Sequence, residues 1–235
     1  MTISLATSVA DRLSVYVLPG RVSDPRSAVA EARDAQAAGI GGVWISERYA
    51  SKEPAVICGA LATGAPGLRV GGTFYAHMRH PVVTASVANA MQALTGNRFG
   101  LVLARAIPAL FKGFDVPELT FARVADSIAI MRRLWARESV DYKGPLGEFS
   151  GMKLTDQYDG PPPPVIFTAV GPKALAFAGQ HCDGVLLHPL LTADAVAQAS
   201  IKVREAAQRA GRNPGDVRVI ANVIVAPDLS AAEEE

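Results

Sequence analysis

The sequence predicts an α/β protein built as a TIM-type (β/α)₈ barrel, and three observations support this. Short continuous apolar runs alternate with helical stretches along most of the chain, as expected for buried parallel strands joined by helices. Gly and Pro mark many of the boundaries between them. The 235 residues suffice for one large core, so we expect a single barrel domain over residues 1–235.

The first half of the chain supplies four strands and three helices in alternation. The strands are expected at 13–18, 42–46, 68–74 and 99–104, and the helices at 25–38, 53–63 and 81–95. Asp24 is a suitable N-cap for the first helix, and Gly39 suits its end. His80 and Pro81 open the third helix, where proline's missing N–H costs nothing.

The helix expected at 120–136 has the clearest periodicity in the chain. Five apolar side chains fall on one face, namely Phe121, Val124, Ile128, Met131 and Trp135. We expect this face in the core rather than at a cofactor.

Residues 137–163 interrupt the alternation and are expected to form a hairpin-like insertion. Val140–Tyr142 and Glu148–Ser150 can pair around Lys143-Gly144-Pro145. Four prolines, residues 161–164, then form a stiff connector. A lid over a site and a plain surface excursion are both compatible with this pattern.

The last third returns to the alternation. We expect strands at 165–167, 185–187 and 217–225, helices at 172–179 and 192–210, and another helix from 229. The strands then number seven, so the eighth strand and the last helices are expected to be missing from this sequence. An open barrel would leave two unpaired edges.

The turn after the strand at 165 is the strongest candidate for a binding site. Gly171 allows close approach to the backbone, Pro172 opens a helix with free N–H groups, and Lys173 adds a cation. This combination suits a phosphate. An ordinary strand-to-helix turn is the alternative.

Two segments resemble the luciferase-like flavin and deazaflavin oxidoreductases. One is Gly171-Pro172-Lys173-Ala174-Leu175, followed by Asp183-Gly184, and the other is Trp44-Ile45-Ser46-Glu47-Arg48. The resemblance implies that the first loop holds the cofactor phosphate and that Glu47 contacts the cofactor ring, as in the deazaflavin-dependent branch.

The resemblance also implies a non-prolyl cis peptide bulge within Gly71-Gly72-Thr73-Phe74, where Gly71, Gly72 and Thr73 would support the ring. His188, at the end of a later strand, would line the same cofactor pocket or simply end its strand.

Arg48, His77 and Arg105 are the candidates for substrate contacts, because each follows a predicted strand. Solvated loop positions or rim salt bridges are the alternatives. Arg105 lies in Ala104-Arg105-Ala106-Ile107, where the family usually has Gly-x-Gly. Arg105 or Lys112 could also meet the acidic tail of the deazaflavin.

We therefore expect an oxidoreductase that transfers a hydride between coenzyme F420 and an unidentified small organic substrate. An FMN-dependent luciferase-like monooxygenase remains the alternative, since both would use the same phosphate loop. A catalytically silent flavin-binding protein also remains open, because no acid–base pair is evident.

Composition limits the other possibilities. The net charge of +1 argues against a nucleic-acid or anionic-membrane partner, and no apolar run is long enough for a membrane span. The two cysteines, Cys58 and Cys182, have no metal-ligand spacing, so no metal site is expected. We expect a cytoplasmic homodimer with both thiols reduced.

Overall fold

The computed structural model describes residues 12–20, 22–48, 52–105 and 119–225. The chain divides into two compact units, Met1–Val165 and Ile166–Glu235. Each unit is an α/β structure with a parallel sheet, and the first also carries an antiparallel hairpin. The predicted fold class and the predicted parallel pairing of the main strands are confirmed.

The first unit contains a sheet with strand order β1-β2-β3-β4. Its strands are β1 (Val15–Tyr16), β2 (Gly42–Ser46), β3 (Arg69–Tyr75) and β4 (Phe99–Ala104). All three neighbouring pairs are parallel. The carboxyl-terminal ends of all four strands therefore lie at the same edge of the sheet.

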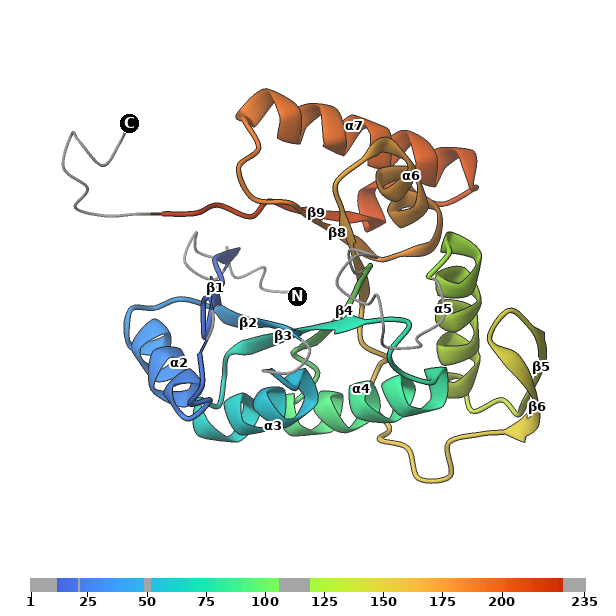
Figure 1. Ribbon diagram of the computed structural model, residues 1–235, viewed down its shortest axis with the longest axis horizontal. Helices are drawn as coiled ribbons and strands as arrows, with labels where there is room; N and C mark the ends of the chain where they lie inside the picture. Colours follow the sequence, from blue (N-terminus) through green and yellow to red (C-terminus); the bar gives the residue numbers. More distant parts are fainter. Residues whose placement is uncertain (1–11, 21, 49–51, 106–118, 226–235) are drawn as a thin grey trace, which may run out of the picture. The chain divides into compact units, whose positions relative to one another are not determined.

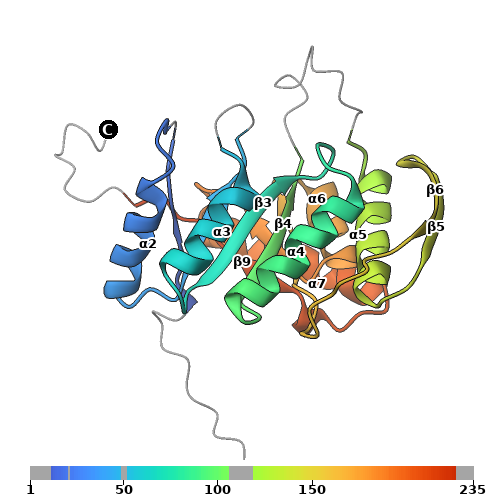
Figure 2. The ribbon, with the colours of Figure 1, turned by 90° about the horizontal axis from the view of Figure 1, so that it is seen from below.

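Four helices of the first unit lie side by side along this sheet (Figures 1 and 2). They are α2 (Ser27–Ala37), α3 (Pro54–Gly64), α4 (Pro81–Thr95) and α5 (Phe121–Trp135). Side-chain caps begin three of them: Glu53 accepts from Val56 N, His80 from Val82 N and Thr120 from Arg123 N. These caps satisfy N–H groups that the helix itself leaves unpaired.

The strand register decides which residues face the helices. Ile45, Gly72 and Leu101 are neighbours across β2, β3 and β4, so they share one face of the sheet. A Cβ added to Gly72 would lie 2.9 Å from Cys58 Sγ on α3. This row therefore faces α3, and the row of Trp44, Gly71 and Gly100 lies on the opposite face.

The periodic face of α5 packs as expected. Val124, Ile128 and Met131 are buried, and the indole N–H of Trp135 donates to the Ala85 carbonyl of α4 at 3.1 Å. The predicted hairpin is also confirmed, with β5 (Val140–Gly144) paired antiparallel to β6 (Gly147–Met152).

The second unit has the strand order β7-β8-β9. Its elements are β7 (Val165–Ala169), α6 (Pro172–His181), β8 (Gly184–Leu187), α7 (Ala193–Arg209), the short 3₁₀ helix η2 (Pro214–Asp216) and β9 (Arg218–Ile220). Helices α6 and α7 pack together at Gly179, where an added Cβ would lie 2.2 Å from the Val203 carbonyl oxygen. Arg212 ties the end of α6 by donating to the Gly179 and Cys182 carbonyls, both at 2.7 Å.

Several expected boundaries were wrong. The strand expected at 13–18 pairs only over Val15–Tyr16, and the strand expected at 217–225 is limited to Arg218–Ile220. The first helix begins at Ser27 with Arg26 at its N-cap position, while Asp24 instead accepts the Arg26 N–H at 3.0 Å. The helix expected from 229 lies outside the described residues.

None of the described helices is long and apolar enough to cross a membrane.

Candidate functional site

Glu47 follows β2, and its acidic side chain is buried, with 8% of it exposed. Its backbone N–H donates to the Thr73 carbonyl at 3.0 Å, which continues the pairing of β2 with β3. One carboxylate oxygen, Oε2, accepts the Tyr75 N–H at 2.5 Å. The carboxylate therefore holds the end of β3.

Arg79 lies beside Glu47 and links it to a second carboxylate. The Arg79 Nη2 group donates to Glu47 Oε1 at 3.3 Å and also to Glu53, the N-cap of α3. Its guanidinium lies 5.2 Å from the centre of the Phe74 ring. Its buried Nε has no hydrogen-bond partner within the described ranges.

The surroundings of Glu47 push its pKa in opposing directions. Burial raises the pKa above its ordinary value of 4.5, while the Tyr75 N–H and the Arg79 charge lower it, and burial has the larger effect. The pKa of the Tyr75 phenol is raised by burial and by the Glu47 charge. Burial thus shifts the pKa of both groups upward because it disfavours their charged forms.

Arg48 and Lys52 close a small loop after β2. The Lys52 N–H donates to the Arg48 carbonyl at 2.7 Å, and the pair forms an isolated antiparallel bridge. Tyr49, between Arg48 and Lys52 in the sequence, lies outside the described residues.

The side chain of Lys52 is buried, and it donates to the carbonyls of Leu18 and Gly20, the latter at 2.7 Å. Glu31 accepts the Leu18 N–H at 2.7 Å. Leu18 has a left-handed φ of 53°, and these contacts hold that unusual backbone at the end of β1. Burial and the Arg48 charge lower the pKa of Lys52.

Gly71 and Gly72 lie inside a regular strand rather than a bulge. Gly71 pairs with Trp44 and Gly100, and Gly72 pairs with Ile45 and Leu101. The described residues contain no cis peptide bond, so the expected non-prolyl cis bulge is wrong. The lack of a side chain serves packing instead: a Cβ on Gly71 would lie 2.6 Å from the Trp44 indole, and one on Gly72 would lie 2.8 Å from the Phe74 ring.

Thr73 shares a sheet face with Ser46, its neighbour in register. The Thr73 side chain is 6% exposed, and its hydroxyl oxygen has no hydrogen-bond partner in the part of the chain that the structure describes. Buried hydroxyls are normally hydrogen-bonded. A polar atom brought by a ligand or by water would satisfy this one.

His77 and Arg105 lie beyond the ends of β3 and β4. The His77 ring centre is 6.1 Å from that of Tyr75, and burial together with the Arg123 charge lowers the pKa of the imidazole. Arg105 is exposed, with its guanidinium 4.5 Å from the centre of the Phe121 ring. Ala106, Ile107 and Lys112 lie outside the described residues.

The second unit carries the predicted phosphate turn. Gly171 is the N-cap residue of α6, Pro172 is in the first turn, and Lys173 is exposed. No side chain caps this helix, and its first turn has no acidic residue. A Cβ added to Gly171 would find no atom within 4 Å, so the approach to the turn is open. His188 is exposed after β8, with Nδ1 2.9 Å from the Pro189 carbonyl oxygen.

The structure thus brings predicted residues of the first unit close together, because Gly71, Gly72 and Thr73 lie on β3 and Glu47 follows the neighbouring strand β2. Arg79 and Lys52 were missed by the sequence analysis. The sequence signal for Arg79 was limited to its place directly before the His80-Pro81 helix start, because its carboxylate partners Glu47 and Glu53 lie 32 and 26 residues away along the chain. Lys52 had no such signal, because its partners are more than 30 residues away.

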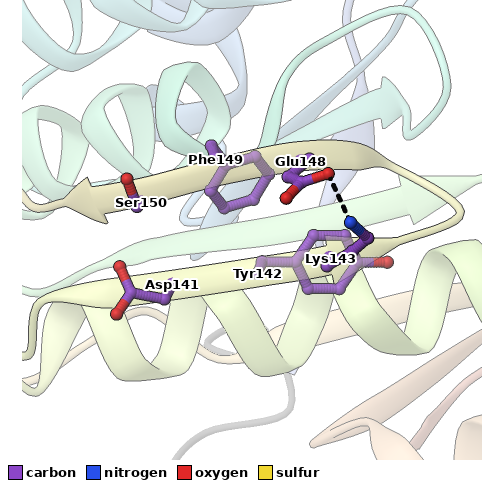
Figure 3. Close-up of a pocket in the computed structure, with 6 residues that line it drawn as sticks. All are labelled: Asp141, Tyr142, Lys143, Glu148, Phe149 and Ser150. Atoms are coloured by element: carbon purple, nitrogen blue, oxygen red, sulfur yellow. Dashed lines mark ion pairs between the residues drawn. The ribbon is translucent and has the colours of Figure 1, made fainter.

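A hollow of about 440 Å³ lies at the surface hairpin, and none of the predicted site residues lines it. Figure 3 shows its six lining side chains, with Lys143 of β5 paired to Glu148 of β6 at 2.8 Å. The Tyr142 and Phe149 rings stack with centres 5.1 Å apart, and the Tyr142 hydroxyl donates to Asp126 of α5 at 2.6 Å. These contacts attach the hairpin to α5, and they account for its aromatic residues without a ligand.

Comparison with known proteins gives consistent matches over most of the chain. The 5,10-methylenetetrahydromethanopterin reductase of Methanolobus tindarius is 30% identical over 217 residues, covering 90% of this chain and 65% of that protein. An F420-dependent glucose-6-phosphate dehydrogenase of Mycolicibacterium gilvum is 29% identical over 145 residues, covering 59% of this chain and 43% of that protein.

A solved structure shows the same fold. The coenzyme F420-dependent tetrahydromethanopterin reductase of Methanopyrus kandleri superposes with a TM-score of 0.77 at 20% identity, covering 89% of this chain and 64% of that one. The chain therefore spans about two thirds or less of the length of these relatives. The sequence profile described as luciferase-like monooxygenase matches residues 3–235. This chain belongs to the luciferase-like monooxygenase family.

Proposed function

We propose that the protein is an oxidoreductase that transfers a hydride between coenzyme F420 and a small organic substrate. The observation that carries the proposal is its similarity, over more than half of its length, to a dehydrogenase described as F420-dependent. The Methanopyrus kandleri reductase, which shares the fold, is described as dependent on the same coenzyme.

The start of α6 fits the phosphate of such a cofactor. Its N–H groups are not capped by a side chain, no carboxylate in the first turn opposes an anion, and the space beside Gly171 is open. A helix N-terminus favours negative charge, and exposed Lys173 adds a cation. Gly171 and Lys173 would bind the phosphate mainly through their backbone N–H groups, and Pro172, which has no N–H, would fix the first turn beside it.

The deazaflavin, when bound, supplies the carbon that accepts or donates the hydride. The protein's part is to hold and orient the two reactants. Gly71, Gly72 and Thr73 are our candidates for support of the cofactor ring, and the buried Thr73 hydroxyl lacks a hydrogen-bond partner among the described residues. Arg48, His77 and Arg105 are our candidates for contacts with the substrate, and His188 for a further cofactor contact.

The runner-up is an FMN-dependent monooxygenase. It is favoured by the family to which the chain belongs, whose description is that of a monooxygenase. A flavin would use the same phosphate turn, so the two proposals differ at the ring and not at α6.

Parallel fluorescence titrations of the protein with F420 and FMN test both proposals. Lys173→Ala should weaken binding about fivefold, or roughly 1 kcal/mol, because one partly solvated charge is lost. Gly171→Val should weaken it more by blocking approach to the backbone. Lys202→Ala, an exposed lysine of α7, is the control and should bind as the parent does.

Equal affinity in the parent, Lys173→Ala and Gly171→Val would remove α6 as the phosphate site. Tighter binding of FMN, with oxygen-dependent turnover of reduced FMN, would favour the monooxygenase. Binding without any turnover would favour a catalytically silent binding protein.

We also propose that the protein acts as a homodimer in the cytoplasm. Both cysteines are buried, and Cys58 forms no disulfide, which suits a reducing compartment. Sedimentation equilibrium gives the mass in solution, and a monomer at micromolar concentration would contradict the dimer.

A further inference from the structure

We propose that Glu47 and Arg79 are positioning residues, forming a charged clasp that fixes the end of β3 for cofactor binding. This inference rests on the proposed function for its effect on the cofactor, whereas the clasp itself can be tested without one. It gives Glu47 a different role from direct contact with the cofactor ring.

The geometry of the carboxylate supports a role within the protein. Each oxygen of Glu47 already has a partner: Oε2 accepts the Tyr75 N–H at 2.5 Å, and Oε1 accepts from Arg79 at 3.3 Å. The side chain is 8% exposed, so it offers little surface to a ligand. Its bonds lead inward to β3 and to the segment that follows β3.

Arg79 extends the clasp to a third element. The same Nη2 group contacts Glu47 after β2 and Glu53 at the start of α3, while Phe74 of β3 supports the guanidinium plane. Arg79 itself lies just before α4. The ends of β2 and β3 and the starts of α3 and α4 are therefore tied at one point, at the edge where βα loops carry function in this class of fold.

The segment between Glu47's two partners carries a predicted substrate contact. Tyr75 is the last residue of β3, Arg79 precedes α4, and His77 lies between them. Holding both ends fixes the path of this short segment. The position of His77, and the strand surface at Thr73, then depend on the clasp.

The charges around Glu47 make the clasp sensitive to removal of Arg79. The groups that act on the Glu47 carboxylate are Arg79 from the β3–α4 connection, Glu53 from the start of α3 and the Tyr75 N–H from β3. Tyr75 also carries a phenol that the Glu47 charge affects. Without Arg79, a buried carboxylate would face only the charge of Glu53, and it would take up a proton at higher pH. The protonated group is a weaker acceptor for Tyr75.

A pH titration followed by NMR tests the clasp without any cofactor, using the Tyr75 amide as the reporter. In Arg79→Met the titration midpoint of this amide should rise by about one pH unit or more relative to the parent. In Glu53→Gln it should fall, because a negative charge near Glu47 is removed. Arg133→Met removes the exposed Arg133–Glu138 pair and is the matched control, with the parent midpoint expected.

Glu53→Gln should move the titration midpoint in the direction opposite to Arg79→Met. Glu53→Gln therefore still tests the clasp if Arg79→Met does not fold. An unchanged midpoint in Arg79→Met, or an unchanged or higher midpoint in Glu53→Gln, would overturn the clasp. Arg79→Lys retains a charge and should give a midpoint between those of the parent and Arg79→Met.

The positioning role is tested by the dissociation constant for F420 over the same pH range. Affinity of Arg79→Met should fall about tenfold relative to the parent as pH drops through its raised midpoint, and Arg79→Lys should restore part of it. Parallel pH profiles in parent and Arg79→Met would overturn the positioning role and leave a purely structural ion pair.

A parent protein that binds neither F420 nor FMN would overturn the proposed function and the positioning role together. The NMR titration would still decide whether the clasp exists. A Glu47→Gln variant with weakened affinity, beside an Arg79→Met variant with parental affinity, would instead support direct contact between Glu47 and the ring.

Discussion

Glu47 illustrates, at the scale of one residue, how burial can outweigh a nearby positive charge. Its pKa is raised although Arg79 and the Tyr75 N–H favour the ionised form. The ionised carboxylate therefore costs free energy in the folded state that it does not cost in the unfolded chain.

This cost gives a pH-dependent prediction for stability. The folded state binds the Glu47 proton more tightly than the unfolded state, so this contribution is full below the ordinary value of 4.5 and is lost as pH rises through the folded pKa. Glu47→Gln should remove this pH-dependent loss of stability. Urea unfolding of the parent and the variant from pH 4.5 upward measures the effect. A difference in unfolding free energy between the two that stays constant with pH would contradict the prediction.

Cys58 supports a second prediction at this scale. The side chain is fully buried, and burial followed by the Glu53 charge raises the pKa of the thiol. Thiolate is the reactive form, so Cys58 should not react with a disulfide reagent in the native protein at mildly alkaline pH. Both Cys58 and Cys182 should react after unfolding in guanidinium. Rapid labelling of the native protein at Cys58 would show that α3 opens readily.

Some site residues could be predicted from the sequence and others could not. Glu47, Arg48 and Gly171 follow strands, and position after a strand can be read from local hydrophobic patterns. Arg79 and Lys52 acquire their roles through contacts with distant segments, such as Lys52 with Leu18. Their burial is set by packing, which a local pattern does not contain.

The strands show the same limit at the scale of elements. The strands at 42–46 and 99–104 were predicted with the right ends because β3 pairs with each of them along its whole length. The apolar run at 217–225 exceeds its strand because β8 offers partners only as far as Leu186, opposite Ile220. The run at 13–18 ends early where Leu18 takes a left-handed φ. Hydrogen-bonding partners, rather than side-chain character, set these ends.

The packing of α6 on α7 leads to a prediction for this pair of helices. A Cβ at Gly179 would lie 2.2 Å from the Val203 carbonyl oxygen, which is backbone and cannot swing aside. Gly179→Ala should therefore destabilise the protein by about 2 kcal/mol. Gly59→Ala in α3 is the control, because nothing lies within 4 Å of that position. It should stabilise by about 0.5–1 kcal/mol through helix propensity. Urea unfolding compares the two, and equal effects would contradict the close packing.

At the scale of the whole chain, the alternation of strands and helices was enough to predict the fold class. Parallel strands that alternate with helices along the chain occur in only a few architectures, so the pattern leaves little choice. The family could be recognised because the segments around Glu47 and Gly171 recur in order. The division into two compact units had no counterpart in composition or spacing.

Selection between the two coenzymes is the prediction that belongs to the complete protein. We expect F420 to bind at least about tenfold more tightly than FMN, a difference of roughly 1.4 kcal/mol. One exposed pair between Arg105 and the acidic tail contributes only about 1 kcal/mol at most, so contacts at the ring must also differ. Titrations with both coenzymes at matched ionic strength measure the ratio. Tighter binding of FMN would contradict it.

Because Trp44 lies against Gly71 of β3, its fluorescence can report on ligands that bind at this strand. Only two tryptophans occur in the sequence, and Trp135 belongs to the packing of α4 and α5. Replacing Trp135 by Phe would leave emission from a single indole that lies against β3 and 6.5 Å from the Tyr16 ring. A chromophore that absorbs in the near ultraviolet and docks on this strand would quench that emission by energy transfer. Ligands could then be screened by the quenching of tryptophan fluorescence before any substrate is known.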